Sequence, residues 1–184
     1  MRFLNQPYYV GLLSAAAMQG AAHQQPMVFQ VMTNKPIRTM HAGKVAIQFS
    51  VNGLLDQMPV TEKQTETGTM RVATPETTAF DLVRYQGDAG HLNNAATVLG
   101  ELAEYMDAQA LVNIADYMRL PDVQRLGYLL DAVSENDLAD PLARWLKQHR
   151  LRSVPLYPGT MVPVGVAIDK RWHILPNVEL EVDL

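Results

Sequence analysis

The segment that most constrains the fold is residues 71–85, RVATPETTAFDLVRY, which predicts a strand running directly into a helix. Val72 favours a strand, and Thr74 is a typical N-cap residue because its side-chain oxygen can accept a hydrogen bond from a helix amide that has no other partner. Pro75 suits the first helical turn, where a missing N–H costs nothing. Glu76 complements the positive end of the helix dipole. The sequence before this junction is typical of a sheet and the sequence after it of helices, so the junction joins two halves of the chain.

The first predicted element is a buried helix that begins at Pro7 and contains YYVGLLSAAAM, residues 8–18. A helix that is apolar nearly all round must be buried, and its small residues would let the sheet approach closely. Gly20 is a suitable left-handed end for it. The apolar run is about half of the roughly 20 residues that cross a bilayer, and the basic leader of a signal peptide is almost missing. We therefore expect a core helix and no membrane partner.

Four strands are predicted upstream of the junction. Residues 27–33 are apolar on both faces, and residues 45–51 alternate strictly between apolar and polar or small side chains, as in a half-buried strand. The connection NKPIRTMHAG between them predicts a loop. Residues 59–65 and 69–73 form a second pair, joined by a turn at Glu66-Thr67-Gly68. These patterns predict a small, mostly antiparallel sheet.

Apolar residues recur at helical spacing from Leu92 onward and predict four helices. The first continues to Met106, Asp107 caps the second, the third begins around Pro121 and Asp122, and the fourth begins at Asp140-Pro141. Their short connections favour antiparallel neighbours. Short strands are expected at residues 154–157 and 172–175.

The predicted fold class is therefore α+β: an N-terminal helix on a mostly antiparallel sheet, then a four-helix antiparallel subdomain and short C-terminal strands. Residues 1–90 would form the helix-plus-sheet half and residues 91–184 the helical half of one compact domain. With 184 residues and 48% hydrophobic content, the chain can bury roughly 70% of its unfolded surface. It contains no cysteine, which excludes disulfides, thiolate zinc sites and cysteine nucleophiles and fits a cytoplasmic location.

Charge is unevenly distributed along a chain whose net charge is −4. Residues 101–140 hold nine acidic and two basic residues, whereas residues 144–171 hold six basic residues and only Asp169. These runs are either solvated helix faces that partly pair, or the basic run forms an anion or RNA patch. The candidate interaction surface comprises two groups of basic residues: Lys35, Arg38 and Lys44 in the first long loop, and Arg144, Lys147, Arg150 and Arg152 in and after the fourth helix.

Common catalytic and cofactor motifs are missing. No glycine begins a Walker loop or a G-x-G-x-x-G turn, no serine lies in G-x-S-x-G, and no Gly-Ser pair of the nucleotidyltransferase signature occurs. A restriction-endonuclease-like site needs a carboxylate two residues before a lysine. The residues in that position here are Thr33, Ala42, Thr61, Trp145 and Ile168. This excludes that nuclease chemistry, although not the fold, and we expect no catalytic or cofactor-binding residues.

A metal site is the weaker interpretation of the acidic C-terminus. Glu179, Glu181 and Asp183 alternate, so on a strand they would share a face and could hold Mg²⁺ or Ca²⁺; the alternative is a polar chain end. The five histidines are nowhere at ligand spacing. We therefore predict no metal site.

Four separated segments together resemble the AbiEi-type antitoxins of bacterial abortive-infection and type IV toxin–antitoxin systems. They are YYVGLLSAAAMQGAAHQQP from Tyr8, TGTMRVATPETTAFDLVRY from Thr67, VLGELAE from Val98 and QRLGYLLD from Gln124. The resemblance implies a non-enzymatic phage-defence protein that neutralises a nucleotidyltransferase-like toxin without lasting contact. It transfers no catalytic residues.

Family members usually also carry an N-terminal winged helix that binds their own promoter. This chain begins directly on the antitoxin domain, as a fragment or a natural short form, which weakens the expectation of DNA binding. A DNA-binding transcriptional regulator remains the first alternative. An enzyme acting on nucleotides or RNA, with a restriction-endonuclease-like fold and without its usual motif, is the second.

Overall fold

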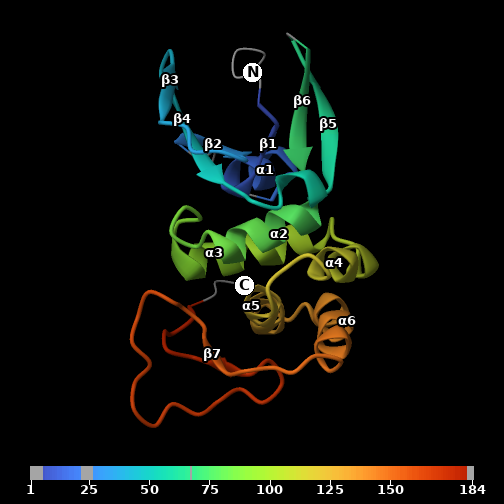
Figure 1. Cartoon of the computed structure of the whole chain (residues 1–184), viewed down its shortest axis with the longest axis vertical. Coiled ribbons are helices and arrows are strands. Elements are labelled where there is room, and N and C mark those ends of the chain that lie inside the picture. Colours follow the sequence, from blue (N-terminus) through green and yellow to red (C-terminus); the bar gives the residue numbers. More distant parts are fainter. Residues whose placement is uncertain (1–5, 22–26, 67, 182–184) are drawn as a thin grey trace.

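A computed structural model describes residues 6–21, 27–66 and 68–181 of the chain. It consists of a sheet, a middle layer of helices and a lower layer of helices and loops (Figure 1). The sheet contains six strands in the order β3-β4-β2-β1-β6-β5. Their bounds are Tyr8–Val10 for β1, Val28–Thr33 for β2, Met40–Ala42 for β3, Val45–Val51 for β4, Val60–Thr65 for β5 and Gly68–Ala73 for β6.

The pairing within the sheet is mixed, with antiparallel pairs in the majority. β1 with β2, β3 with β4 and β5 with β6 pair antiparallel, whereas β2 with β4 and β1 with β6 pair parallel. The helix α1, Leu12–Met18, packs against α2 and β2, between the sheet and the middle layer. The α+β fold class expected from the sequence is thus confirmed.

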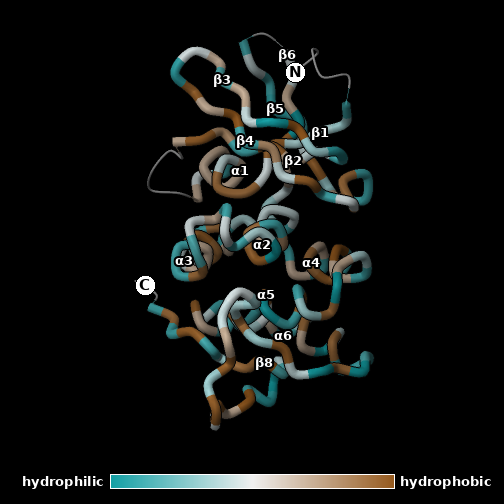
Figure 2. The backbone as a smooth tube through the Cα atoms, turned by 60° about the vertical axis from the view of Figure 1, so that its left-hand side comes forward, coloured by the Kyte–Doolittle hydropathy of each residue, from teal (hydrophilic) through white to brown (hydrophobic). Residues whose placement is uncertain are grey.

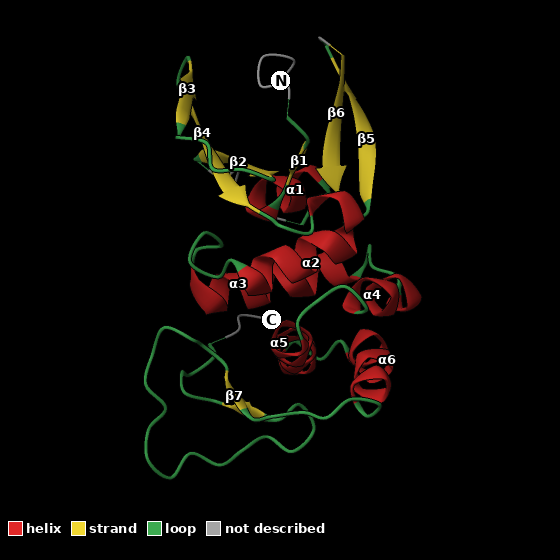
Figure 3. Ribbon diagram, in the orientation of Figure 1, coloured by secondary structure: helices red, strands yellow, loops and turns green. Residues whose placement is uncertain are grey.

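Four helices follow the central helix α2, Pro75–Arg84. They are α3, His91–Ala103; α4, Ala108–Ala115; α5, Leu120–Ala132; and α6, Asn136–Leu146. After α6 the chain is irregular except for β7, Val154–Pro155, and β8, Ile174–Leu175, which pair in parallel (Figure 3). Among the described residues, no helix has the length and apolar character needed to cross a membrane.

The helix α2 is the centre of the molecule, as the sequence junction indicates. Every residue from Glu76 to Val83 is buried, because α2 packs against α1, α3, α4 and α5. The predicted cap is present, since the Thr74 hydroxyl accepts a hydrogen bond from the Thr77 amide at 3.3 Å. The Glu76 carboxylate accepts one from the Asp107 amide at 2.8 Å and so ties the start of α2 to the start of α4. Figure 2 shows hydrophobic segments along α1 and α2, between the sheet and the lower helices.

The prediction of one continuous helix from Pro7 is wrong at its first turn. Tyr8–Val10 forms strand β1 between β2 and β6, and the helix starts only at Leu12. Gly11 separates the two with extended backbone. A Cβ on Gly11 would lie 2.6 Å from Met32 Cγ, so any larger residue here would require the buried Met32 side chain to move. Bulky aromatic and β-branched residues at 8–10 favour the strand, and two neighbouring strands supply its hydrogen-bond partners.

Two further predictions of structure are corrected, and a strand considered only as the basis of a weaker interpretation is not formed by the described C-terminal residues. The expected loop at 34–43 contains β3, which pairs with β4 through a turn at Gly43, whose φ is +61°. The fourth helix starts at Asn136, with Pro141 inside it; amphipathic packing against α4 and α5 outweighs the one backbone bond that proline removes. Residues 178–181 form no strand, although Val178 and Leu180 still pack against the core.

Candidate functional site

The two predicted groups of basic residues lie at opposite ends of the molecule. Lys35, Arg38 and Lys44 are exposed near β3 and β4, at the top of Figure 1. Arg144 and Lys147 are exposed at the end of α6, in the lower layer. The candidate interaction surface is therefore two separate surfaces.

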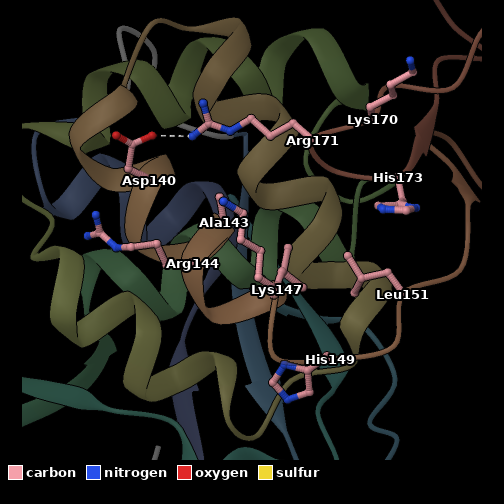
Figure 4. A pocket seen from close by; sticks show the side chains of 10 residues that line it. Asp140, Ala143, Arg144, Lys147, His149, Leu151, Lys170, Arg171 and His173 are labelled. Carbon is pink, nitrogen blue, oxygen red and sulfur yellow. Dashed lines mark hydrogen bonds and ion pairs between the residues drawn. The ribbon is translucent and has the colours of Figure 1, made fainter.

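The second group borders a hollow of about 860 Å³. Its walls come from α6, from the segment that follows α6, and from residues just before β8. They are Asp140, Ala143, Arg144, Leu146, Lys147, His149, Leu151, Lys170, Arg171 and His173. We call this feature the basic hollow. Figure 4 shows Arg144 and Lys147 on one side and Lys170 and His173 on the other; the Arg144 guanidinium and the Lys170 ammonium point outward from the middle of the view.

Two predicted residues, Arg150 and Arg152, are not among the residues that line the basic hollow. Both are exposed in the chain that leaves α6. The backbone carbonyl of Arg152 accepts a hydrogen bond from Gln124 Nε2 at 3.0 Å, which fixes this segment on α5. Lys170 and Arg171 replace them as lining cations; both lie in the basic run recognised in the sequence, but no local pattern places them opposite α6.

The cations of the basic hollow differ in their pairing. Arg171 binds Asp140 at 2.5 Å and Asp131 at 3.2 Å, and its guanidinium lies 5.0 Å from the centre of the Trp172 ring. In the part of the chain that the structure describes, Arg144, Lys147 and Lys170 take part in no ion pair. One cation is thus a fixed part of the wall and three are available to a ligand.

Trp172 attaches the C-terminal wall of the hollow to α5. Its indole is buried over Gly127, where an added Cβ would lie only 1.9 Å from a ring carbon. The indole N–H donates to Asp131 Oδ2 at 2.6 Å, and the backbone carbonyl of Trp172 accepts from Gln124 Nε2 at 2.8 Å. Gln124, Gly127 and Asp131 of the segment QRLGYLLD therefore form the seat of the hollow, the surface of α5 on which Trp172 packs.

A flat ring surface lies at the rim of the hollow. The exposed imidazole of His149 stacks on the Trp145 ring with centroids 4.1 Å apart and planes inclined by 33°. Trp145 is held in turn by its indole N–H, which donates to Asp116 at 2.8 Å. The ring pair is thus positioned by α4 and α6 together.

A second polar cluster, enclosed in the core, joins the sheet to α2. The Tyr9 hydroxyl donates to Asp81 Oδ2 at 2.9 Å and accepts from Asn52 Nδ2 at 2.8 Å. Burial raises the pKa of Asp81 to about 7, against smaller opposing effects of the Tyr9 hydrogen bond and the Arg84 charge. Burial likewise raises the pKa of the Tyr9 phenol. Perturbed acids often mark functional sites, but these groups are closed off from solvent and have a structural role.

A smaller hollow of about 270 Å³ lies where α2, α5 and the chain after β7 meet. Its charged groups largely satisfy one another, since Asp122 binds Arg119 at 2.9 Å and Arg125 at 3.5 Å. Burial lowers the pKa of the Arg125 guanidinium, which also donates to the Pro155 carbonyl at 3.0 Å. This cluster fastens β7 to α5.

The structure brings together no metal-binding group of side chains in residues 6–21, 27–66 and 68–181. Glu179 and Glu181 are exposed on irregular backbone rather than on a strand, and Asp183 lies outside the described residues. The proposed alternation of three carboxylates on one strand face is therefore not formed by the two that are described.

A known protein family matches most of this chain. Residues 9–132 match the AbiEi antitoxin C-terminal domain. The chain belongs to this family. The match confirms the resemblance found in the four sequence segments, and the structure shows how these segments meet: Tyr9 of the first bonds to Asp81 of the second, and α5, which carries the fourth, packs against α2 and α3.

A solved structure shares the fold of this AbiEi domain. The RV2827C protein from Mycobacterium tuberculosis superposes with a TM-score of 0.65 at 13% identity, over 94% of this chain and 63% of that one. The chain thus spans less than two thirds of the length of that protein, and the likeness concerns the fold alone. No curated protein matches the chain at a significant level.

The basic hollow extends beyond the part of the AbiEi domain that defines the family. All of its lining residues lie between 140 and 173, after the matched residues 9–132. Its seat on α5, formed by Gln124, Gly127 and Asp131, lies inside the match. The family match therefore includes the part of α5 that supports the hollow, but it includes none of the residues that line the hollow.

Proposed function

We propose that this chain is the antitoxin domain of a bacterial toxin–antitoxin system and neutralises a nucleotidyltransferase-like toxin. The observation that supports this most is the family match over residues 9–132, from β1 to the end of α5. In this proposal the protein acts in the cytoplasm during abortive infection, as part of phage defence, and catalyses no reaction. The sealed position of Asp81, the carboxyl with the most perturbed pKa, agrees with a structural rather than a catalytic use.

Neutralisation without a lasting complex is the form of the function that we propose. The experiment is growth of cells that express the toxin encoded beside this gene, with this chain or an empty vector expressed from a second promoter. We expect growth to be restored by the chain, with no stable co-purification of the two proteins. Full toxicity at equal levels of folded chain would contradict the antitoxin function, and a stable complex would contradict only its contact-free form.

A further inference from the structure

Three cations that have no ion-pair partner among the described residues border the basic hollow. Arg144 lies in the last turn of α6 and Lys147, three positions on, is its C-cap with helical backbone, which places the two on one face. Lys170 reaches the same hollow from the C-terminal segment (Figure 4). Only Asp140 contributes a carboxylate to the lining, and it is already bound to Arg171. Because the whole chain carries a net charge of −4, this local positive region would direct a polyanion to one place.

The floor of the hollow is apolar. Leu146 is only 1% exposed, and Ala143 and Leu151 are half-buried beside it. The half-buried side chains of Ala143 and Leu151 offer apolar contact to a flat base of a flexible strand, and the His149 ring offers a further stacking surface at the rim.

We propose that the basic hollow binds single-stranded RNA. Arg144, Lys147 and Lys170 contact backbone phosphates, while a base lies on the apolar floor or against His149. The volume of about 860 Å³ is that of a small-ligand cleft, so it admits a few nucleotides of a flexible strand and excludes a rigid duplex. Arg150 and Arg152, exposed on the chain that leaves the hollow, continue the positive track.

The test is fluorescence anisotropy of a labelled single-stranded oligoribonucleotide of about ten residues, titrated with the full chain at about 50 to 200 mM salt. The test variant carries Arg144→Glu, Lys147→Glu and Lys170→Glu. The matched control carries Lys35→Glu, Arg38→Glu and Lys44→Glu at the far end of the molecule. Each reversal changes the charge by two, so both triple variants change the net charge from −4 to −10, and only position differs.

We expect the test variant to bind RNA at least about ten-fold more weakly and the control to stay within about two-fold of the wild type. Three phosphate contacts predict a slope of log affinity against log salt near −2, because each contact with a single strand contributes about −0.7. The slope should be clearly shallower in the test variant, which keeps only Arg150 and Arg152 of the positive track. A duplex DNA of the same length should bind more weakly than the RNA.

The proposal is overturned if the wild type does not bind RNA, if both triple variants lose binding equally, or if duplex DNA binds as tightly as RNA. Circular dichroism verifies folding. If the test variant does not fold, the milder pair Lys147→Gln and Lys170→Gln replaces it, with Lys35→Gln and Lys44→Gln as control, and the same difference between hollow and far end is required. Since this assay uses purified chain without toxin, its outcome is independent of growth rescue.

Discussion

At the scale of single residues, the contact between Tyr9 and Asp81 connects two distant parts of the sequence. The carboxyl is buried in the core, where its charged form is costly, yet its hydrogen bond from Tyr9 is intact at 2.9 Å. Gly11 permits this arrangement, because a Cβ there would lie 3.2 Å from Asp81 Oδ2 and closer still to Met32. A protonated carboxyl that accepts from Tyr9 suits this site better than a carboxylate.

Stability should therefore depend on pH through Asp81. Its pKa rises from 3.8 in the unfolded chain to about 7 in the folded one, so between these values the folded state holds a proton that the unfolded state has released. The contribution is complete below about pH 4 and is lost as the pH rises through 7. We expect the free energy of unfolding to fall by on the order of 2–4 kcal/mol across this range from this group alone.

The measurement is urea denaturation at several pH values for the wild type and for Asp81→Asn, which keeps an acceptor for Tyr9 and cannot ionise. Other titrating groups contribute equally to both proteins, so the difference between the two curves isolates Asp81. If the free energies of unfolding of the two proteins changed in parallel with pH, the proposed protonation of Asp81 in the folded state would be contradicted.

At the scale of elements, the C-terminal segment can pack closely on α5 because the helix has a glycine, Gly127, at the point of contact. Trp172 fills the space over Gly127, and its indole N–H and backbone carbonyl are bound by Asp131 and Gln124. One helix thus positions a wall of the basic hollow that is about 45 residues away in the sequence. Helix propensity alone would favour alanine at position 127, so the glycine is explained by packing.

Alanine substitutions at two helix-interior glycines should have opposite effects. Gly127→Ala would place a Cβ 1.9 Å from the Trp172 ring and should cost about 1–3 kcal/mol or more, with a change in tryptophan fluorescence. Gly100→Ala on α3 meets its nearest atom only at 3.7 Å and should add about 0.5–1 kcal/mol. Thermal unfolding of both variants is the measurement. Equal destabilisation of the two would show that the effect comes from the helix backbone and not from a clash with Trp172.

At the scale of the whole molecule, one hydrophobic cluster runs through both halves. It includes Tyr9 and Val72 of the sheet, Phe80 of α2, and Leu142 and Trp172 beyond. Halves that share a core are expected to unfold together, although residues 1–90 and 91–184 differ clearly in secondary structure.

Unfolding should accordingly be a single transition. The only tryptophans are Trp145 and Trp172, both in the helical half, whereas far-UV circular dichroism reports on the whole chain. We expect the urea midpoints from fluorescence and from circular dichroism to coincide. A fluorescence midpoint displaced from the circular dichroism midpoint would instead mean that the two halves are separate folding units.

The sequence could predict elements whose signals are local. The N-caps at Thr74 and Asp107 are present, with hydrogen bonds of 3.3 Å and 2.8 Å to the amides three residues on, and the strands and helices predicted from periodicity were mostly found. It could also predict the basic character of residues 144–171, because charge counts need no fold. These features depend on neighbours within a few positions along the chain, and the four family segments can likewise be recognised in the sequence.

Tertiary structure decided what depends on distant partners. Tyr8–Val10 became a strand because β2 and β6 leave a place between them, and Met40–Ala42 became one because the edge of β4 was free. Gly127 and Trp172 meet only in the folded chain, and only there do Lys147 and Lys170 border the same hollow. The sequence therefore determined the family and the kinds of charge, whereas the fold determined which charges share a hollow, since that requires long-range packing which no local pattern encodes.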